Sequence, residues 1–371
     1  MKTVLITGAN GFIGKNLVAT LERMEDVEIL KYGSENTIEQ LEELVEKADF
    51  VFHLAGVNRP KDVKEYETGN KGFTEQLLRI LKEKNKKVPV LLSSSIQATL
   101  DNPYGTSKKA AEDAVFQYGK ETGANVYVYR LPNVFGKWCK PNYNSVVATW
   151  CYNIANNLPI QINDPSTKLT LVYIDDVIEE FINALYGKEN QDVNGFCSVK
   201  RTFQVTLGEL ADILYSFKKS RETLVMPNLE GDFERFLYAT YISYLPKGEF
   251  GYHLDMKRDN RGWLAEFIKS NQFGQIFISR TKPGITRGNH WHHTKVEKFL
   301  VIEGEAVIKF RSIHGSEVIE YRVSGEELRV IDIPPGYTHS ITNVGETEVI
   351  TLFWANEIFD PEQPDTYFLE V

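Results

Sequence analysis

The sequence has few cysteines and no long apolar run. Its three cysteines, Cys139, Cys151 and Cys197, are scattered and odd in number. They fit a reducing compartment and exclude a disulfide framework or a cysteine-based zinc site. No segment approaches the ~18 continuous apolar residues of a membrane-spanning helix. The first residues pass from a short apolar run into glycines, which predicts a strand and not a signal peptide. We therefore expect a cytoplasmic protein with no membrane partner.

Positive charge is also in deficit. Lys and Arg number 42 against 51 Asp and Glu, a net charge of −9. This balance argues against nucleic acid as a partner. Nucleotide substrates stay open, because local sites bind them. At 371 residues and 42% hydrophobic content, the chain is long enough for two domains with their own cores.

Residues 1 to about 190 alternate short apolar runs with longer helical stretches. This alternation predicts a Rossmann-type doubly wound parallel sheet covered on both faces. The expected strands are Val4–Ile6, Phe50–Leu54, Val88–Leu92, Val126–Leu131 and Leu169–Ile174, and the expected helices between them are Lys15–Met24, Ile38–Lys47, Glu65–Lys84, Tyr104–Gly119 and Ser145–Asn156.

The pattern of apolar residues changes near Leu245-Pro246. Beyond it, many short runs rich in Val, Ile, Phe and Tyr are broken by Gly, Pro and Asn, and no long amphipathic helix is evident. This pattern predicts an all-β sandwich or barrel. We therefore expect a nucleotide-binding domain over residues 1–245 and a β domain over residues 246–371.

A glycine-rich turn follows the first expected strand, in the order Thr7-Gly8-Ala9-Asn10-Gly11-Phe12-Ile13-Gly14. The three glycines let the backbone approach a pyrophosphate, whose charge is met by the N-terminus of the next helix. A turn of this kind is a weak signal alone. Its place between the first strand and the first helix favours a nicotinamide nucleotide site.

Tyr104 and Lys108 lie four residues apart, on one face of an expected helix. A Lys ammonium beside a phenol lowers the pKa of the phenol, so Tyr104 can exchange a proton with a substrate oxygen near neutral pH. A nearby serine hydroxyl can orient that oxygen, and Ser93-Ser94-Ser95 ends the preceding strand.

These motifs together resemble the extended short-chain dehydrogenase/reductase family, over about residues 1 to 245. The resemblance also includes Leu54-Ala55-Gly56, Asn133-Val134-Phe135-Gly136 and Tyr173-Ile174-Asp175-Asp176-Val177. It implies that Tyr104 is the acid, that Lys108 binds the cofactor ribose, and that Ser95 orients the substrate, with Ser94 as the competing choice. Only eight residues separate Ser95 from Tyr104, fewer than is usual in that family.

The end of the second strand bears on the choice of cofactor. An NAD site usually has an acid there to bind the ribose diol, and Val27–Tyr32 ends without one. Lys31 could meet a 2′-phosphate, which favours NADPH. The alternative is that Lys31 is a solvated charge.

A second set of motifs lies in the β domain. Gly284 and His290, His292, Glu297 and Gly304 follow one another at short intervals, and Pro334-Pro335-Gly336-Tyr337-Thr338-His339 comes later. This spacing matches the two cupin motifs nearly throughout, so a cupin jelly-roll barrel is expected. His290 and His292 project from one face of a strand. Three imidazoles and a carboxylate suit Zn²⁺, with Mn²⁺ and Fe²⁺ as alternatives.

A rival reading exists within that fold. Asp259-Asn260-Arg261-Gly262 and Arg287-Gly288-Asn289-His290 resemble parts of metal-free sugar 3,5-epimerases, in which this histidine is a base. The complete ligand set favours metal. The general base stays open among Lys282, Lys295, Tyr337 and Asp259.

Along nearly the whole chain, segments such as Leu91–Ala98, Phe135–Ser145 and Gly288–Lys295 resemble the CapF-type capsular polysaccharide enzymes. The resemblance implies a homodimer with a zinc-bearing cupin epimerase domain and an NADPH reductase domain. These convert UDP-2-acetamido-2,6-dideoxy-L-arabino-hexos-4-ulose to UDP-2-acetamido-2,6-dideoxy-L-talose, towards N-acetyl-L-fucosamine. Polar residues after the fifth strand are expected to contact substrate: Asn133, Lys140, Asn142 and Asn144.

Two alternatives remain. The β domain could be a structural or dimerising module, with reduction as the sole activity. A metal oxygenase is disfavoured, because the partner domain already supplies redox chemistry.

Overall fold

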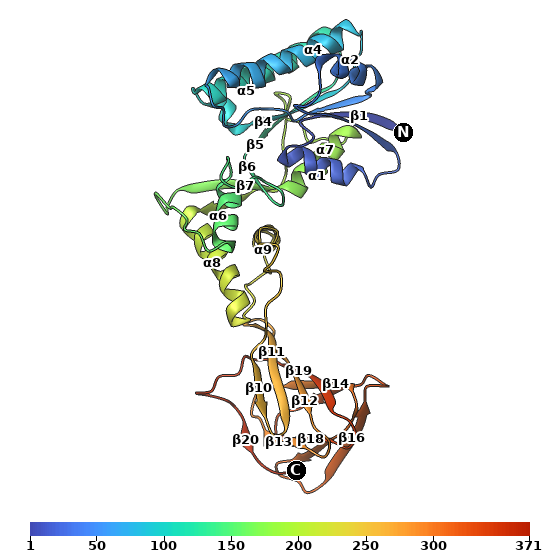
Figure 1. Cartoon of the computed structure of the whole chain (residues 1–371), viewed down its shortest axis with the longest axis vertical. Coiled ribbons are helices and arrows are strands. Elements are labelled where there is room, and N and C mark those ends of the chain that lie inside the picture. Colours follow the sequence, from blue (N-terminus) through green and yellow to red (C-terminus); the bar gives the residue numbers. More distant parts are fainter. The chain divides into compact units, whose positions relative to one another are not determined.

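The computed structural model describes residues 1–371 and divides into two compact units (Figure 1). The first comprises Met1–Leu214 and Asp232–Pro246, and the second Tyr215–Gly231 and Lys247–Val371. Residues 215–231 fall in the range expected for the first domain, yet they pack in the second unit. There the Met226 N–H donates to the Lys269 carbonyl at 2.7 Å, and the Lys269 N–H donates to Leu224 at 2.8 Å.

The first unit is built on a parallel sheet, as the sequence predicts for the N-terminal part. Its six strands lie in the order β2-β1-β3-β4-β5-β8. The order reverses between β1 and β3, so connections leave in opposite directions there and open a crevice at the carboxyl ends. The strands are β1 (Lys2–Thr7), β2 (Val27–Tyr32), β3 (Phe50–His53), β4 (Val90–Ser95), β5 (Val126–Leu131) and β8 (Phe196–Cys197).

Helices cover both faces of this sheet (Figure 1). On one face lie α1 (Phe12–Leu21) and α7 (Ile174–Leu185). On the other lie α2 (Ile38–Lys47), α4 (Phe73–Glu83) and α5 (Pro103–Thr122). The strands are apolar on both sides because both sides are buried, and the core of the second face combines Val51, Val90 and Val128 with side chains of α2, α4 and α5. The short α3 (Lys64–Tyr66) and a π-helical turn, η1 (Glu67–Gly72), precede α4.

A small sheet completes this unit. It contains β6 (Asn133–Phe135), β7 (Lys168–Tyr173) and β9 (Phe203–Thr206), in the order β6-β7-β9. The ring of Tyr173 stacks on Phe236 with 4.3 Å between centroids, so α9 (Asp232–Ile242) is held against the sheet. The remaining helices are η2 (Ile96–Thr99), α6 (Val146–Ala155) and α8 (Leu207–Thr223), and the boundary between the units falls within α8. None of the helices combines the length and apolar content that a bilayer crossing needs.

The second unit is built from two antiparallel sheets. The six-stranded sheet has the order β10-β11-β12-β19-β14-β17 and the five-stranded sheet has the order β16-β15-β18-β13-β20. Phe299 and Phe353 of the first meet Ile308, Phe310 and Ile341 of the second in one core. The strands are β10 (Met256–Asp259), β11 (Gly262–Ser270), β12 (Gly274–Thr281), β13 (Thr286–Trp291), β14 (Glu297–Glu303), β15 (Glu305–Ser312), β16 (Val318–Ser324), β17 (Val330–Ile333), β18 (Tyr337–Asn343), β19 (Val349–Ala355) and β20 (Tyr367–Phe368).

The expectation of a cupin jelly-roll barrel is wrong. No strand pairing joins the two sheets, whose edges are formed by β10, β17, β16 and β20. The alternation of apolar and polar residues predicts which face of a strand is buried. It carries no information on whether distant edge strands pair, and that pairing decides closure.

Gly105 lets the first turn of α5 lie against the turn that precedes it. An added Cβ would be 2.3 Å from the Gln97 carbonyl oxygen and 2.4 Å from the Leu100 carbonyl oxygen, and backbone cannot move aside cheaply. We expect Gly105→Ala to destabilise the first unit by about 1–3 kcal/mol, measured by urea unfolding. Gly248→Ala, whose Cβ meets open space, is the control. Equal midpoints for the two variants would contradict this account.

Candidate functional site

A cleft of about 980 Å³ lies at the carboxyl ends of the strands of the first unit. It brings together most residues that the sequence nominated. Ala55, Lys31 and Asn142 do not line it, although the other nominated residues do: Gly8, Asn10, Gly11, Phe12, Ile13, Gly14, Leu54, Gly56, Ser95, Tyr104, Lys108, Asn133, Lys140 and Asn144.

The glycine-rich turn has the geometry of a phosphate cradle. Gly8 has φ +71°, and a Cβ there would be 2.7 Å from the Ala55 nitrogen. A Cβ at Gly14 would be 2.3 Å from the Gly8 carbonyl oxygen. Helix α1 begins after Gly11 with no side-chain cap, so its first N–H groups are donors for a phosphate. The residues present therefore fit a dinucleotide.

Tyr104 lies in the cleft with its hydroxyl 3.1 Å from Asn58 Oδ1, to which it donates. Burial raises the pKa of Tyr104 above its ordinary value, and a contact with Ser95 opposes this only in part. This direction is opposite to the prediction that Lys108 lowers the pKa. The phenol therefore stays protonated at neutral pH, which is the form that can donate a proton.

The structure separates the two candidate serines. The Ser94 hydroxyl donates to Glu112 Oε1 at 2.6 Å, and Arg130 binds both oxygens of the same carboxylate at 2.9 and 2.6 Å. Ser94 is thus committed to a buried ion pair. Ser95 lines the cleft and contacts Tyr104. The short connection between Ser95 and Tyr104 consists of the single turn of η2 followed by a loop that ends at Asn102. The side chain of Asn102 caps α5.

Lys108 lines the same cleft as Ser95 and Tyr104. Its ammonium donates to the Ser93 carbonyl at 2.8 Å, and the side chain is buried. Burial lowers the pKa of Lys108 to about 8, with Glu112 opposing the shift.

Sequence reasoning missed two asparagines near these groups. Asn58 accepts from Tyr104. Asn70, buried in η1, accepts from the Val57 N–H at 2.8 Å and donates to Ser107 Oγ at 2.9 Å, so it ties the segment after β3 to α5. No spacing rule marks either residue, because each acts through a contact distant in sequence.

The end of β2 differs from the prediction. The Lys31 ammonium pairs with Glu22 at 2.9 Å and does not line the cleft. Instead, Glu35 accepts a hydrogen bond from Asn10 of the glycine-rich turn at 3.0 Å. A carboxylate is therefore present beside the glycine-rich turn, but it lies three residues after the end of β2 and not within that strand.

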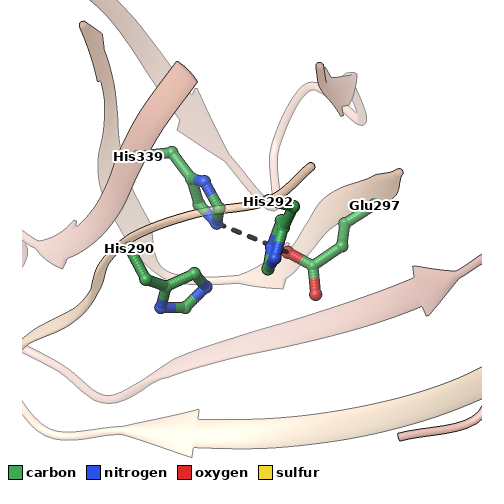
Figure 2. Close-up of side chains that lie close together, drawn as sticks. All are labelled: His290, His292, Glu297 and His339. Carbon is green, nitrogen blue, oxygen red and sulfur yellow. Dashed lines mark hydrogen bonds and ion pairs between the residues drawn. The ribbon is translucent and has the colours of Figure 1, made fainter. Parts of the chain in front are cut away.

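A second candidate site lies in the β unit, where His290, His292, Glu297 and His339 converge (Figure 2). Their potential ligand atoms all lie within 4.8 Å of one another. Glu297 Oε2 is 3.3 Å from Nε2 of both His292 and His339. The structure thus brings together all four residues that the sequence nominated as metal ligands.

A bulge in β13 produces this convergence. Gly288 pairs with Ser340, but the next pair is His290 with His339, so Asn289 is the extra residue. Gly288 has φ +98°, and a Cβ there would be 2.7 Å from the His339 carbonyl oxygen. The bulge turns His290 toward His339, with ring centroids 4.5 Å apart.

The protonation states and the unpaired atoms in this cluster fit a divalent cation. His339 is fully buried, and its Nε2 has no partner other than Glu297 Oε2 at 3.3 Å, so a metal would satisfy that nitrogen. Burial disfavours the Glu297 carboxylate, yet contacts with His292 and His339 hold its pKa at about 2. Burial also lowers the pKa of His290 to about 4. A neutral imidazole and an ionised carboxylate are the forms that bind zinc.

Two of the residues that the sequence nominated as a general base already have ionic or hydrogen-bond partners. The buried Lys295 ammonium donates to the Pro364 carbonyl at 2.5 Å. Asp259 pairs with Arg261 at 2.5 Å. Lys282 and Tyr337 stay open.

Known proteins are similar to this chain along its whole length. A UDP-2-acetamido-2,6-beta-L-arabino-hexul-4-ose reductase of Pseudomonas aeruginosa is 45% identical over 99% of this chain and 98% of its own length. The crystal structure of the capsular polysaccharide assembling protein CapF from Staphylococcus aureus has a TM-score of 0.93 and 53% identity, covering 99% of this chain and 100% of that one.

More distant relatives match one unit at a time. A UDP-N-acetylglucosamine 4-epimerase from Methanobrevibacter ruminantium shares the fold of 66% of this chain, with a TM-score of 0.55 and 21% identity, and covers 98% of its own chain. Two family models match. The NAD dependent epimerase/dehydratase family covers residues 4–195, and the polysaccharide biosynthesis C-terminal domain covers residues 257–367. The second of these matches the β unit.

Over half of the chain matches the first model, and its whole length matches relatives at 45% and 53% identity. The chain therefore belongs to the NAD dependent epimerase/dehydratase family and, within it, to the CapF-type capsular polysaccharide enzymes.

Proposed function

We propose that this protein is a bifunctional enzyme of capsular polysaccharide synthesis that epimerises and then reduces a UDP-linked 4-keto sugar. The substrate is UDP-2-acetamido-2,6-dideoxy-L-arabino-hexos-4-ulose and the product is UDP-2-acetamido-2,6-dideoxy-L-talose. One observation carries the proposal. A chain that matches a UDP-keto-hexulose reductase over its full length also has a buried His/Glu cluster in a separate unit.

In the first unit, reduction needs a proton for the oxygen of the C4 ketone. A reduced nicotinamide, when bound in this cleft, would supply hydride to the carbon of that ketone. Tyr104, kept protonated by burial, donates its proton to the oxygen, and Ser95 orients the same oxygen. Lys108 lines the same cleft and would bind the ribose of the cofactor.

In the second unit, epimerisation needs removal of the proton on C3. A divalent cation held by His290, His292, Glu297 and His339 would polarise the ketone and stabilise the enolate. Chemistry sets the order of the two steps. Once the C4 ketone is reduced, the C3 proton is no longer acidic, so epimerisation comes first.

A second candidate keeps reduction as the sole activity, with the β unit as a structural or dimerising module. The name of the Pseudomonas aeruginosa relative favours it, because that protein is called only a reductase. Deuterium uptake separates the two candidates.

We expect the protein to exchange the C3 proton of the UDP-4-keto sugar with D₂O in the absence of any nicotinamide, observed by NMR. Tyr104→Phe should retain this exchange and lose about 100-fold or more in reduction rate, since it lacks the proton donor. His290→Ala should lose the exchange. Exchange that survives in His290→Ala and His339→Ala would instead make the β unit structural.

The Lys108 ammonium should make cofactor binding depend on pH. Because its pKa is about 8 in the free protein, the charged form that binds the ribose is lost as the pH rises through 8. We expect affinity for the nicotinamide cofactor to fall about tenfold between pH 7 and pH 10, measured by fluorescence titration. Lys108→Met should bind weakly at every pH. Constant wild-type affinity up to pH 10 would remove this role.

NADPH is the cofactor that we propose, and two charged side chains near the end of β2 bear on it. Lys31, which pairs with Glu22 here, would attract a 2′-phosphate, whereas Glu35 beside Asn10 would repel one and suit the diol of NADH. We expect Glu35→Gln to tighten NADPH binding about fivefold and Lys31→Ala to weaken it about fivefold, measured by titration of both cofactors. Tighter binding of NADH than of NADPH by the wild type would reverse the choice.

A further inference from the structure

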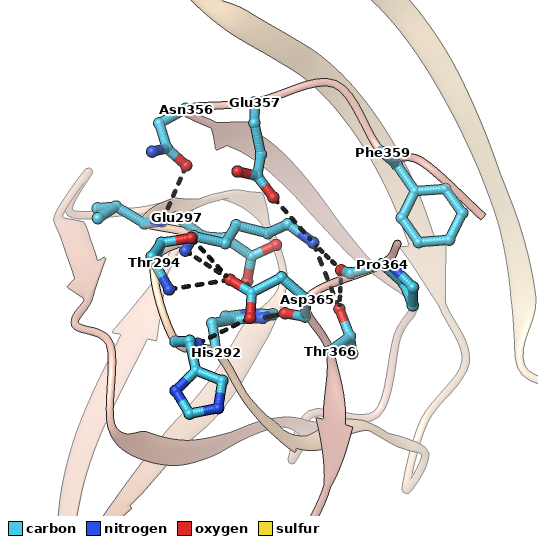
Figure 3. A network of polar contacts seen from close by, with 12 residues as sticks. His292, Thr294, Glu297, Asn356, Glu357, Phe359, Pro364, Asp365 and Thr366 are labelled. Atoms are coloured by element: carbon cyan, nitrogen blue, oxygen red, sulfur yellow. Dashed lines mark hydrogen bonds and ion pairs between the residues drawn. The ribbon is translucent and has the colours of Figure 1, made fainter. Parts of the chain in front are cut away.

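The last residues of the chain lie against the histidine cluster (Figure 3). Tyr367 and Phe368 of β20 pair with Trp291 and His290 of β13. The Leu369 N–H donates to the Asn289 carbonyl at 2.9 Å. We call residues Pro364–Leu369 the strap. It therefore joins the strand that carries His290 and that ends one residue before His292.

Asp365, in the strap, holds the turn that connects His292 to Glu297. Its carboxylate accepts the backbone N–H groups of His293, Thr294 and Lys295, each at 2.9 Å. It also accepts the Thr294 hydroxyl at 3.1 Å. Asp365 has φ +39°, a conformation that Asp and Asn adopt more readily than other side chains. One carboxylate thus sets the path of the chain between two of the clustered residues.

The backbone of Asp365 acts on His292 directly. Its carbonyl oxygen lies 2.6 Å from His292 Nδ1. A carbonyl can only accept, so Nδ1 must carry the proton. The lone pair of the neutral ring is then on Nε2, the nitrogen that lies 3.3 Å from Glu297 and faces the other clustered side chains (Figure 2).

Lys295 holds the strap from its other side. This buried ammonium donates to the Pro364 carbonyl at 2.5 Å and to Thr366 Oγ1 at 3.3 Å, and it lies 3.8 Å from Glu357. The residues on both sides of Asp365 are thus fixed, and so is the direction of its carbonyl (Figure 3).

We propose that Asp365 is a positioning residue for a metal ligand, and that the strap selects the His292 tautomer that binds a divalent cation through Nε2. This inference rests on the metal site of the proposed function. Partners that orient a histidine ligand change metal affinity about 10- to 100-fold when they are lost. The coupling is reciprocal, so metal binding must also stabilise the strap.

The test compares Asp365→Ala with Asp360→Ala in the full-length protein. Asp360 is a matched control, because it is an exposed carboxylate of the same tail that accepts only local contacts, such as the Glu362 N–H at 2.9 Å. Zn²⁺ affinity is measured by competition with a chromophoric chelator. We expect Asp365→Ala to bind Zn²⁺ about 10- to 100-fold more weakly than the wild type and Asp360→Ala to match the wild type. Nicotinamide binding by the first unit should be unchanged in both.

A second measurement follows the strap itself. Exchange of the Leu369 amide hydrogen should slow when Zn²⁺ is added to the wild type and should not respond in Asp365→Ala. If Asp365→Ala folds poorly, Asp365→Asn takes its place. It favours the same φ and retains one accepting oxygen, so its affinity should lie between those of Asp365→Ala and the wild type.

The outcomes separate the two proposals. Wild-type affinity in Asp365→Ala and Asp365→Asn, or zinc-independent exchange of the strap in the wild type, overturns the strap inference and leaves the metal site standing. A wild-type protein that binds neither Zn²⁺, Mn²⁺ nor Fe²⁺ stoichiometrically overturns both.

Discussion

A buried carboxylate lies at the base of each candidate site, and the cost of burying its charge dictates what surrounds it. Glu112 has no exposed surface, and a lone carboxylate there would be strongly unfavourable. Arg130 and Ser94 satisfy it. In the β unit, Glu297 is almost as deeply buried and faces imidazole nitrogens. The first carboxylate is satisfied by Arg130 and Ser94, while the second faces imidazole nitrogens that could hold a metal ion with it.

This contrast explains how neighbouring groups acquire different tasks. Both serines line the cleft, but Glu112 accepts the hydroxyl of Ser94, whereas Ser95 contacts Tyr104. Because Lys108 is buried with a carboxylate nearby, its pKa falls only to about 8 and it can stay charged at neutral pH. Tyr104, buried and in contact with Ser95, keeps its proton. The cleft is thereby arranged to donate a proton, which is the direction that reduction of a ketone requires.

The β unit solves a different problem, which is to bring four side chains from three strands to one point. The bulge at Asn289 turns His290 toward His339, and the strap fixes the ring of His292 through Asp365. Both the bulge and the strap orient a side chain by fixing the position of the backbone. Two packed sheets with a shared core provide a rigid base for it. The fold of this unit therefore shapes the site in two main ways, through the register between β13 and β18 and through the pairing of β20 with β13.

Local geometry explains what the sequence by itself determined. The glycines at 8, 11 and 14, the four-residue spacing of Tyr104 and Lys108, and the two-residue spacing of His290 and His292 follow from helix and strand periods, which any stretch of chain expresses alone. The parallel sheet followed from alternating strands and helices in the same way.

Only the tertiary structure decided features that depend on contacts distant in sequence. It separated Ser95 from Ser94, directed Lys31 to Glu22, and reversed the expected direction of the Tyr104 pKa, since burial outweighs a neighbouring charge. It also left the β sheets open and placed Asp365 beside His292, 73 residues away in the chain. Solvent exclusion and strand pairing are set by the whole fold, and no period or spacing in the sequence encodes them.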